Sequence, residues 1–528
     1  MAIAARKSMQ ENTVENLLLL ASCFLPLSGK GLLKMSGILN FLKAKANVTY
    51  TENGAKTYLT SCSDCLDLFF KAGAMRNADE ADIRRAVDRA YAEDPHKAMK
   101  IIFFARDVRG GLGERRFFRI ALRYLADIHP ESVKKNIPLI AEYGRYDDLI
   151  SLMGTSCEGE AVELISRQLS EDVDGMKNKK PVSLLAKWLP SVNTSSRETV
   201  LAGKRLCKAL AMSERDYRRT LSALRRYTDI IENRLRTRDY TFDYSKQPAG
   251  AMFKYRQAFI RNDGERYVEF IKAVKSGKAQ MHAATLYPYE IVRSVLQNGQ
   301  MSEKERLSLD VSWRELSRAN PIYGNSNALA VIDGSGSMTW GAGDLRPIDA
   351  ALSLGIFFAE NIKGAFKNHF ITFSEHPRLV EIKGSDITDK VRYCDSFNEV
   401  ANTNLEAVFD LILNTALENK LHQEDIPGRL YIISDMEFDY CVTGGNNETM
   451  FNAMKHKYER CGYALPEIVF WNVNSRSENI PVRMSQTGAA LVSGNSPSVF
   501  NMVTTGGISP AKIMEDIIGS ERYKAVAA

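Results

Sequence analysis

Hydrophobic and polar positions follow two different patterns along this chain of 528 residues. Between about residues 51 and 318, apolar residues recur at spacings of three and four, which predicts short amphipathic helices. Alternating β-branched runs are nearly absent there. The expected helices span 79–91, 95–104, 114–128, 131–143, 213–235 and 264–274. Short helices joined by tight loops over such a length predict an α-helical solenoid, in which neighbouring helical pairs bury each other's apolar faces.

The pattern changes at Asn325. Short, continuously apolar runs now alternate with helical segments. The expected strands are 329–332, 369–373, 429–434, 467–473 and 490–493, and the helices between them are 348–362, 405–417 and 449–461. This alternation predicts a doubly wound, mostly parallel α/β sheet with its ligand site at the carboxyl ends of the strands. We therefore expect an N-terminal helical segment (1–46), a helical repeat-like domain (47–324) and an α/β domain (325–528).

Composition restricts the class of protein. Hydrophobic residues make up 45% and charged residues 25% of the chain, which excludes a disordered or low-complexity protein. No stretch of about 18 uncharged apolar residues occurs, so we expect no membrane-spanning helix. The eight cysteines are scattered, which is typical of a reduced, cytoplasmic protein. Cys62 and Cys65 form a lone CxxC that would either bind zinc or pack on a helix face.

Oxygen-bearing side chains follow the expected strands of the C-terminal region. Asp333, Ser335 and Ser337 lie directly after the first strand, in the string VIDGSGSM. Thr403 precedes the helix at 405, and Asp435 follows the strand 429–434. Carboxylates and hydroxyls are hard ligands that suit Mg²⁺ or Mn²⁺ rather than zinc. These residues therefore predict a site for Mg²⁺ (or Mn²⁺), whereas the alternative is that DGSGS is only a Gly-Ser turn.

The order and spacing of these residues resemble the metal-ion-dependent adhesion site of von Willebrand factor A domains. Thr403 lies 70 residues and Asp435 102 residues after Asp333. The resemblance implies that Asp333, both serines and Thr403 surround a divalent ion and that Asp435 binds through water. It also implies one open coordination position for an acidic group of a partner.

We expect no enzymatic activity at this site. The motif contains no His or Lys that could act as a general base, and the chain has no HExxH motif. Glu437 and Asp439 would either act as bases or, as we favour, add negative charge around the cation.

Charge divides the chain into a basic front and an acidic back. Residues 325–528 hold 17 Lys and Arg against 25 Asp and Glu, a net −8, so residues 1–324 carry +14. Several basic strings also contain aromatic residues and glycines, a combination suited to phosphate binding and base stacking. The expected RNA contacts are Arg106, Arg109, Arg115, Arg116, Arg145, Arg218, Arg219, Lys254, Arg256 and Arg261. Tyr255 and Phe259 would stack on bases. The alternatives are a solvated helix face, or arginines that pair with the acidic domain.

The two-part layout resembles Ro-type RNA-binding proteins of the TROVE class. These have a ring of HEAT-like helical hairpins and a C-terminal von Willebrand A domain, and they bind structured RNA with single-stranded ends. More closely, the chain resembles an uncharacterised family from plants, bacteria and viruses. The shared strings include CLDLFF (65–70), YGRYDDL (143–149), LAKWLPS (185–191), FITFSEHP (370–377) and SDMEFD (434–439). These resemblances imply an RNA-binding protein, with an intracellular scaffold that grips an acidic residue of a protein partner as the alternative.

Overall fold

The computed structural model describes residues 42, 45–324, 327–340, 345–398, 404–439, 449–476, 478–503 and 508–528. The expected N-terminal helical segment therefore lies almost entirely outside the described residues. Residues 48–528 form one compact unit. In the part of the chain that the structure describes, no helix combines the length and the apolar character needed to cross a bilayer.

The first part of this unit is helical, as the sequence predicts, but it opens with a two-stranded antiparallel hairpin that the sequence pattern did not indicate. The hairpin strands are β1 (Val48–Tyr50) and β2 (Lys56–Tyr58). The helices are α3 (Asp64–Ala72), α4 (Glu80–Glu93), α5 (Pro95–Arg106), α6 (Arg115–Ile128), α7 (Pro130–Asn136), α8 (Ile140–Tyr143), α9 (Glu158–Lys177), α10 (Leu185–Trp188), α11 (Arg197–Ala209), α12 (Glu214–Tyr227), α13 (Ile231–Arg236), α14 (Ala249–Asn262), α15 (Gly264–Lys275), α16 (Pro288–Leu296) and α17 (Glu303–Ala319). A 3₁₀ helix, η3 (Tyr146–Leu152), follows α8.

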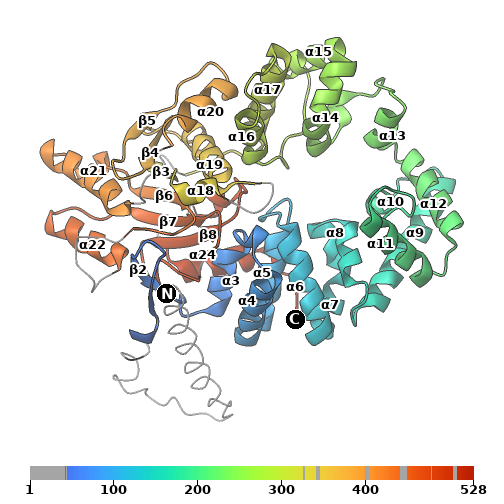
Figure 1. Ribbon diagram of the computed structural model, residues 1–528, viewed down its shortest axis with the longest axis horizontal. Coiled ribbons are helices and arrows are strands. Elements are labelled where there is room, and N and C mark those ends of the chain that lie inside the picture. The colour runs from blue at the N-terminus through green and yellow to red at the C-terminus, as the bar shows by residue number, and fades with distance from the viewer. Residues whose placement is uncertain are drawn as a thin grey trace, which may run out of the picture. The chain divides into compact units, whose positions relative to one another are not determined.

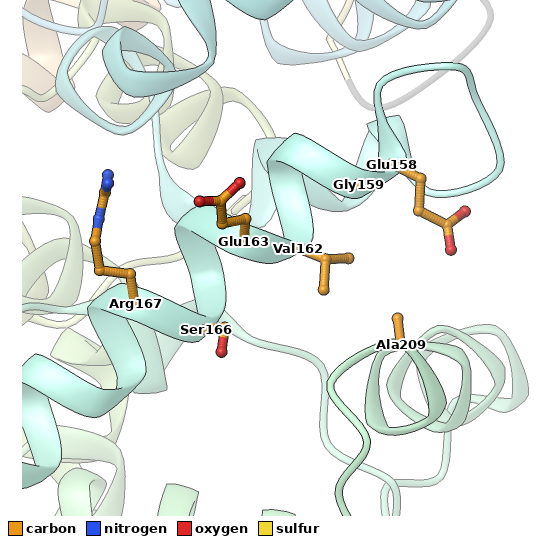
Figure 2. Close-up of a pocket in the computed structure, with 7 residues that line it drawn as sticks. All are labelled: Glu158, Gly159, Val162, Glu163, Ser166, Arg167 and Ala209. Carbon is orange, nitrogen blue, oxygen red and sulfur yellow. The ribbon is translucent and has the colours of Figure 1, made fainter.

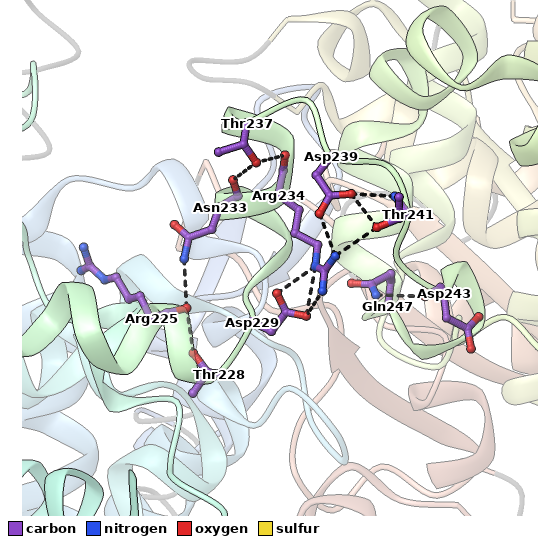
Figure 3. A network of polar contacts seen from close by, with 10 residues as sticks. All are labelled: Arg225, Thr228, Asp229, Asn233, Arg234, Thr237, Asp239, Thr241, Asp243 and Gln247. Atoms are coloured by element: carbon purple, nitrogen blue, oxygen red, sulfur yellow. Dashed lines mark hydrogen bonds and ion pairs between the residues drawn. The ribbon is translucent and has the colours of Figure 1, made fainter. Parts of the chain in front are cut away.

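Two of the expected helices are interrupted. The segment 131–143 divides into α7, a 3₁₀ turn at Ile137–Leu139 and α8, because Pro138 has no amide hydrogen to continue an α-helix. The segment 213–235 divides into α12 and α13, and Asp229 between them adopts a left-handed φ of +49°. Arg234 of α13 holds this junction through ion pairs with Asp229 at 2.6 Å and Asp239 at 2.8 Å (Figure 3).

The C-terminal part is a six-stranded, mostly parallel sheet with helices packed against it (Figure 1). Its strands are β3 (Ala328–Asp333), β4 (His369–Phe373), β5 (Leu379–Glu381), β6 (Arg429–Ser434), β7 (Glu467–Asn472) and β8 (Ala489–Ser493). Its helices are α18 (Gly336–Thr339), α19 (Pro347–Asn361), α20 (Ile387–Asp395), α21 (Leu405–Glu418), α22 (Met450–Arg460), α23 (Val499–Met502) and α24 (Pro510–Ile518).

The strand order β5-β4-β3-β6-β7-β8 is that of a doubly wound sheet. All neighbours are parallel except β5, which pairs antiparallel with β4 at one edge. The five expected strands agree with β3, β4, β6, β7 and β8, whereas the three-residue edge strand β5 was not predicted. The chain reverses its direction of winding beside β3, so the carboxyl ends of β3 and β6 border a crevice.

One hydrophobic core runs through both the helical region and the sheet. Helix α3 packs against β8, and α16 packs against α19. The contact at β8 is so close that a Cβ on Gly73 would lie 2.6 Å from the backbone of Gly494, so only glycine fits there. A second, smaller core is formed mainly by α14 and α15, with Val311 of α17. The helical region and the sheet are therefore parts of one packed unit.

Candidate functional site

Two buried carboxylates lie at the carboxyl ends of adjacent parallel strands. Asp333 is the last residue of β3, and Asp435 directly follows β6. Neither side chain is exposed to solvent. Because β3 and β6 are neighbours at the point where the winding reverses, both acids face the crevice in which doubly wound sheets bind their ligands.

Hydroxyl groups complete the cluster around Asp333. The Ser434 hydroxyl donates to Asp333 Oδ2 at 2.5 Å, and the Ser335 amide donates to Oδ1 at 2.9 Å. The hydroxyls of Ser335 and Ser337 lie 3.1 Å apart. The structure thus brings together four of the five residues predicted to hold a metal, and Thr403 lies outside the described residues.

The electrostatics of this cluster favour a cation. Burial and the nearby carboxylate of Asp435 raise the pKa of Asp333. Burial also raises the pKa of Asp435, although Arg476, Ser337 and the amide of Glu437 act to lower it. Asp435 Oδ2 accepts no hydrogen bond within the described residues. Two carboxylates and two hydroxyls with an unsatisfied oxygen fit a hard divalent ion such as Mg²⁺ or Mn²⁺.

Sequence reasoning missed two charged residues beside this cluster. Arg476, in the loop after β7, places Nη2 3.1 Å from Asp435 Oδ2 and 3.2 Å from Glu52 Oε2. Glu52 lies in the turn between β1 and β2, so the first element of the helical region reaches the metal cluster. No local sequence signal could reveal this pairing, because the three residues come together only in the folded chain.

Glu437 is held by hydrogen bonds beside the cluster. Its carboxylate accepts hydrogen bonds from the Glu52 amide at 2.8 Å and from Asn479 Nδ2 at 2.9 Å, and its side chain is buried. A carboxylate that holds a loop in this way adds negative charge near the cluster, and the expectation that it does not act as a base stays a prediction.

The two cysteines of the CxxC pair lie in different environments. Cys62 is exposed, whereas Cys65 is buried and its thiol donates to the carbonyl of Ala90. Within the described residues, no group of three or more His, Cys, Asp and Glu side chains is arranged to hold a metal. Cys65 therefore packs on a helix face, whereas Cys62 is exposed and precedes α3.

Two of the ten predicted RNA contacts are buried and already bonded, which is incompatible with the predicted role. Arg106 pairs with the buried Asp148 at 2.7 Å. Arg256 donates to the carbonyl of Phe253 at 2.8 Å and also to Ser294. Phe259, expected to stack on bases, is buried in the second core. These side chains stabilise helix packing, and the sequence pattern could not distinguish the two faces.

Arg109 and Arg116 are exposed but bind backbone carbonyls. Arg109 donates to Glu142 O at 2.9 Å, and Arg116 donates to Ala78 O at 2.6 Å. The adjoining glycines pack inside the protein: a Cβ on Gly113, whose φ is +73°, would collide with the Tyr287 hydroxyl. This glycine loop is a packing element, not an open phosphate loop.

Arg145 lies in a cation–aromatic cluster. Its guanidinium lies over the ring of Trp188, 4.2 Å from the centroid, and Lys187 Nζ lies 5.5 Å from the same ring. Arg145 makes no ion pair within the described residues. Burial lowers its pKa, and so do the charges of Arg106 and Arg115, whereas the carboxylates of Asp147 and Asp148 act to raise it. A guanidinium on an indole is suited to a phosphate next to a stacked base.

The remaining predicted contacts are exposed basic side chains that make no ion pair with any described residue. They are Arg115, Arg218, Arg219, Lys254 and Arg261. A separate open groove between α9 and α11, in which Val162 and Ala209 face each other, does not include any of them (Figure 2). Its charged lining residues are Glu158, Glu163 and Arg167, a mixture that does not favour an anion.

Two family models match the chain. A domain of unknown function (DUF2828) matches residues 51–166 and 159–319, more than half of the sequence. The chain belongs to the DUF2828 family. A second domain of unknown function (DUF7788) matches residues 327–522. In this DUF2828 protein, the first model covers the basic helices and the second covers the carboxylate cluster.

Two individual proteins are also similar. The uncharacterized protein L728 of Acanthamoeba polyphaga mimivirus is 28% identical over 498 residues, covering 87% of this chain and 85% of the viral protein. The crystal structure of the Deinococcus radiodurans Ro (RSR) protein covers 86% of this chain and 93% of its own, with 11% identity and a TM-score of 0.34.

Proposed function

We propose that this chain binds RNA on its helical region and holds Mg²⁺ or Mn²⁺ at the edge of its sheet, without catalysing a reaction. The observation that carries the RNA proposal is an arginine stripe on α12, which consists of Arg215, Arg218, Arg219 and Arg226. All four are exposed, and none makes an ion pair with a described residue.

The stripe follows from the helical period. At 100° per residue, positions 215, 219 and 226 project within about 40° of one another. Position 218 projects about 60° from position 215 in the opposite direction around the helix. The opposite face is buried through Tyr217, Leu221 and Leu224. At 1.5 Å per residue the stripe is about 16 Å long, so it can contact several successive phosphates of one strand.

The stripe does not serve to hold the helical region on the sheet. Other residues make the ion pairs between the two, such as Arg306 with Asp386, Arg522 with Asp107 and Arg476 with Glu52. Four like charges on one helix repel each other and destabilise it unless a polyanion neutralises them. The cluster of Arg145, Lys187 and Trp188 favours RNA over other polyanions as the ligand, because an indole can stack on an unpaired base.

For the metal, Asp333, Ser335, Ser337 and Asp435 would hold the ion, with Thr403 as the fifth residue that the adhesion-site resemblance implies. A divalent ion there would neutralise two buried carboxylates and offer a coordination position to an acidic group. The set contains no His or Lys, which supports a binding role.

Fluorescence anisotropy with a labelled single-stranded RNA tests the RNA proposal on the full chain. We expect affinity to fall with salt, and the double variant R218A/R219A to bind more weakly with a slope shallower by about 0.7 for each phosphate that the variant no longer neutralises. The matched control is R84A/R85A, which also removes two adjacent exposed arginines from a helix, but ones that pair with Glu80 and Asp82.

Equal losses in both double variants would show that only net charge matters and would contradict a site on α12. Poly-glutamate of matched charge is the second ligand. If it binds as tightly as RNA, the stripe is a surface for acidic proteins and the RNA proposal is wrong.

A further inference from the structure

Arg476 is the one cationic group that the structure places directly on the metal cluster, within the described residues. Its guanidinium bridges Asp435 Oδ2 and Glu52 Oε2, at 3.1 and 3.2 Å. The Asp435 oxygen that it faces accepts no hydrogen bond within the described residues. The contact is therefore a charge interaction at an oxygen that remains available for a better-placed cation.

The two segments that carry Arg476 and Glu52 are each anchored by hydrogen bonds that do not involve these two side chains. The Ser475 amide donates to Ala74 O at 3.2 Å, which fixes the loop after β7. The Glu52 amide donates to Glu437 Oε2 at 2.8 Å, and Asn53 Nδ2 donates to Glu437 O at 2.8 Å, which fixes the β1–β2 turn. Substituting the side chain of residue 476 or 52 leaves these backbone anchors in place, so we expect both variants to fold.

A guanidinium at Asp435 and a divalent ion among Asp333, Ser335, Ser337 and Asp435 would be like charges a few ångströms apart in a poorly solvated site, which is strongly unfavourable. Glu52 offers Arg476 a second carboxylate, whose Oε2 lies 3.2 Å from Nη2 of the guanidinium. We propose that Arg476 competes in cis with the metal for Asp435, and that Glu52 is the partner that Arg476 keeps when the metal enters. This inference rests on the proposed metal site and makes Arg476 the residue that sets its affinity.

Calorimetric titration of the full chain with Mg²⁺ tests the competition. We expect R476Q to bind Mg²⁺ at least about tenfold more tightly than the unaltered chain, because the competing charge is gone. The charge-matched control is K383Q. Lys383 follows β5, whose last residue pairs with His369 at the start of β4. Lys383 therefore lies near the amino end of β4, whereas the metal cluster lies at the carboxyl ends of the parallel strands. We expect K383Q to leave the Mg²⁺ affinity unchanged.

The variant E52Q and the double variant E52Q/R476Q then define the role of Glu52. If Glu52 acts through Arg476, E52Q weakens Mg²⁺ binding in the unaltered chain and has no effect in the R476Q background, so the two changes are coupled. A weakening by E52Q that persists in R476Q would make Glu52 a metal ligand and overturn its role as the partner of Arg476.

The outcomes for Arg476 separate this inference from the metal site itself. An R476Q affinity that is unchanged or weaker, while D333A binds no Mg²⁺, overturns the competition and leaves the metal site standing. An absence of Mg²⁺ binding in the unaltered chain and in R476Q overturns both.

Discussion

At the scale of single residues, the most consequential charges are buried ones. Asp107, in the string ARDVRGGLGERR, is fully buried. It accepts hydrogen bonds from Arg522 Nε at 2.7 Å and from the Tyr523 hydroxyl at 3.1 Å. Burial acts to raise the pKa of Asp107, but the hydrogen bonds and charge of Arg522 outweigh it, so this pKa is lowered. The segment that contains Asp107 thus binds the residues that follow α24.

We expect D107N to lower the free energy of unfolding at pH 7 by about 2 to 4 kcal/mol, because it removes one partner of a largely buried ion pair. A carboxylate with a lowered pKa contributes stability above its unfolded pKa, and this is lost as the pH falls through its folded pKa. The difference between D107N and the unaltered chain should therefore shrink below about pH 4. Urea unfolding of both chains at pH 7 and pH 3 measures this difference in the free energy of unfolding.

The control for this variant is D174N. Asp174 forms an exposed ion pair with Lys177, so we expect an effect of less than about 1 kcal/mol. A D107N penalty that stays constant from pH 7 to pH 3 would contradict a charged Asp107 as the source of the stability.

At the scale of elements, the short helix α10 and the start of η3 bring two motif strings together. Arg145 of YGRYDDL lies over Trp188 of LAKWLPS, and Arg225 of α12 holds the end of α10 by donating to Leu189 O at 2.8 Å. Lys187 of α10 also lies 3.6 Å from Glu232 of α13. The pairing of Arg145 with Trp188 thus depends on the packing of several helices and places a cation beside an aromatic ring.

We expect the two residues of this pair to affect RNA binding differently. W188A removes a stacking surface, so it should cost about 1 to 3 kcal/mol of binding free energy for single-stranded RNA without changing the salt slope. R145A removes a phosphate contact, so it should also make the slope shallower by about 0.7. The same anisotropy titrations, repeated at several salt concentrations, measure both effects.

W340A is the matched control, because Trp340 is 79% exposed and lies in the sheet region. Circular dichroism confirms that each variant folds. A loss of affinity for W340A equal to that for W188A, or no loss for either Arg145 or Trp188, would mean that this pair serves packing alone.

At the scale of the whole molecule, the helical region contacts the sheet region both through its early helices and through its last two helices, α16 and α17. Tyr523, after α24, lies against Tyr143 and Phe104, with ring centroids 5.7 and 5.9 Å apart. At the other end, α16 packs on α19 and α17 packs on α20. Cutting the chain near residue 324 would expose apolar surfaces on both sides, so RNA and metal experiments require the full chain.

Metal removal should leave the fold intact. The carboxylate cluster lies at the rim of a sheet whose strands are buried by their own apolar residues, so we expect one cooperative thermal transition in EDTA, unlike a structural zinc domain. Excess Mg²⁺ should raise the stability by mass action, by about 2.7 kcal/mol at 100 times the dissociation constant.

Calorimetric scans with EDTA and with Mg²⁺ measure these effects. The variant D333A should show no difference between the two conditions. Loss of the transition in EDTA would show instead that the ion is part of the folded core.

The sequence by itself was enough to locate most elements of the sheet and the acids at its edge. A buried strand in a parallel sheet is a continuous apolar run, and the residues that come after such a run lie at the carboxyl edge. For this reason β6 agrees with its expected range, and Asp333, Ser335, Ser337 and Asp435 converge. In the first region α4, α5, α6 and α15 agree with expected helices, whereas the long helices α9 and α17 were not among the expected ranges and the breaks at Pro138 and Asp229 were not anticipated.

Only the tertiary structure decided which charged side chains are exposed and can bind a ligand. Arg106 and Arg115 belong to the same basic string, yet one is buried against Asp148 and the other is exposed. The joining of Glu52, Arg476 and Asp435 is likewise invisible along the chain. The physical reason is that backbone conformation responds to neighbours in sequence, whereas the burial and pairing of a long charged side chain depend on what distant segments pack against it.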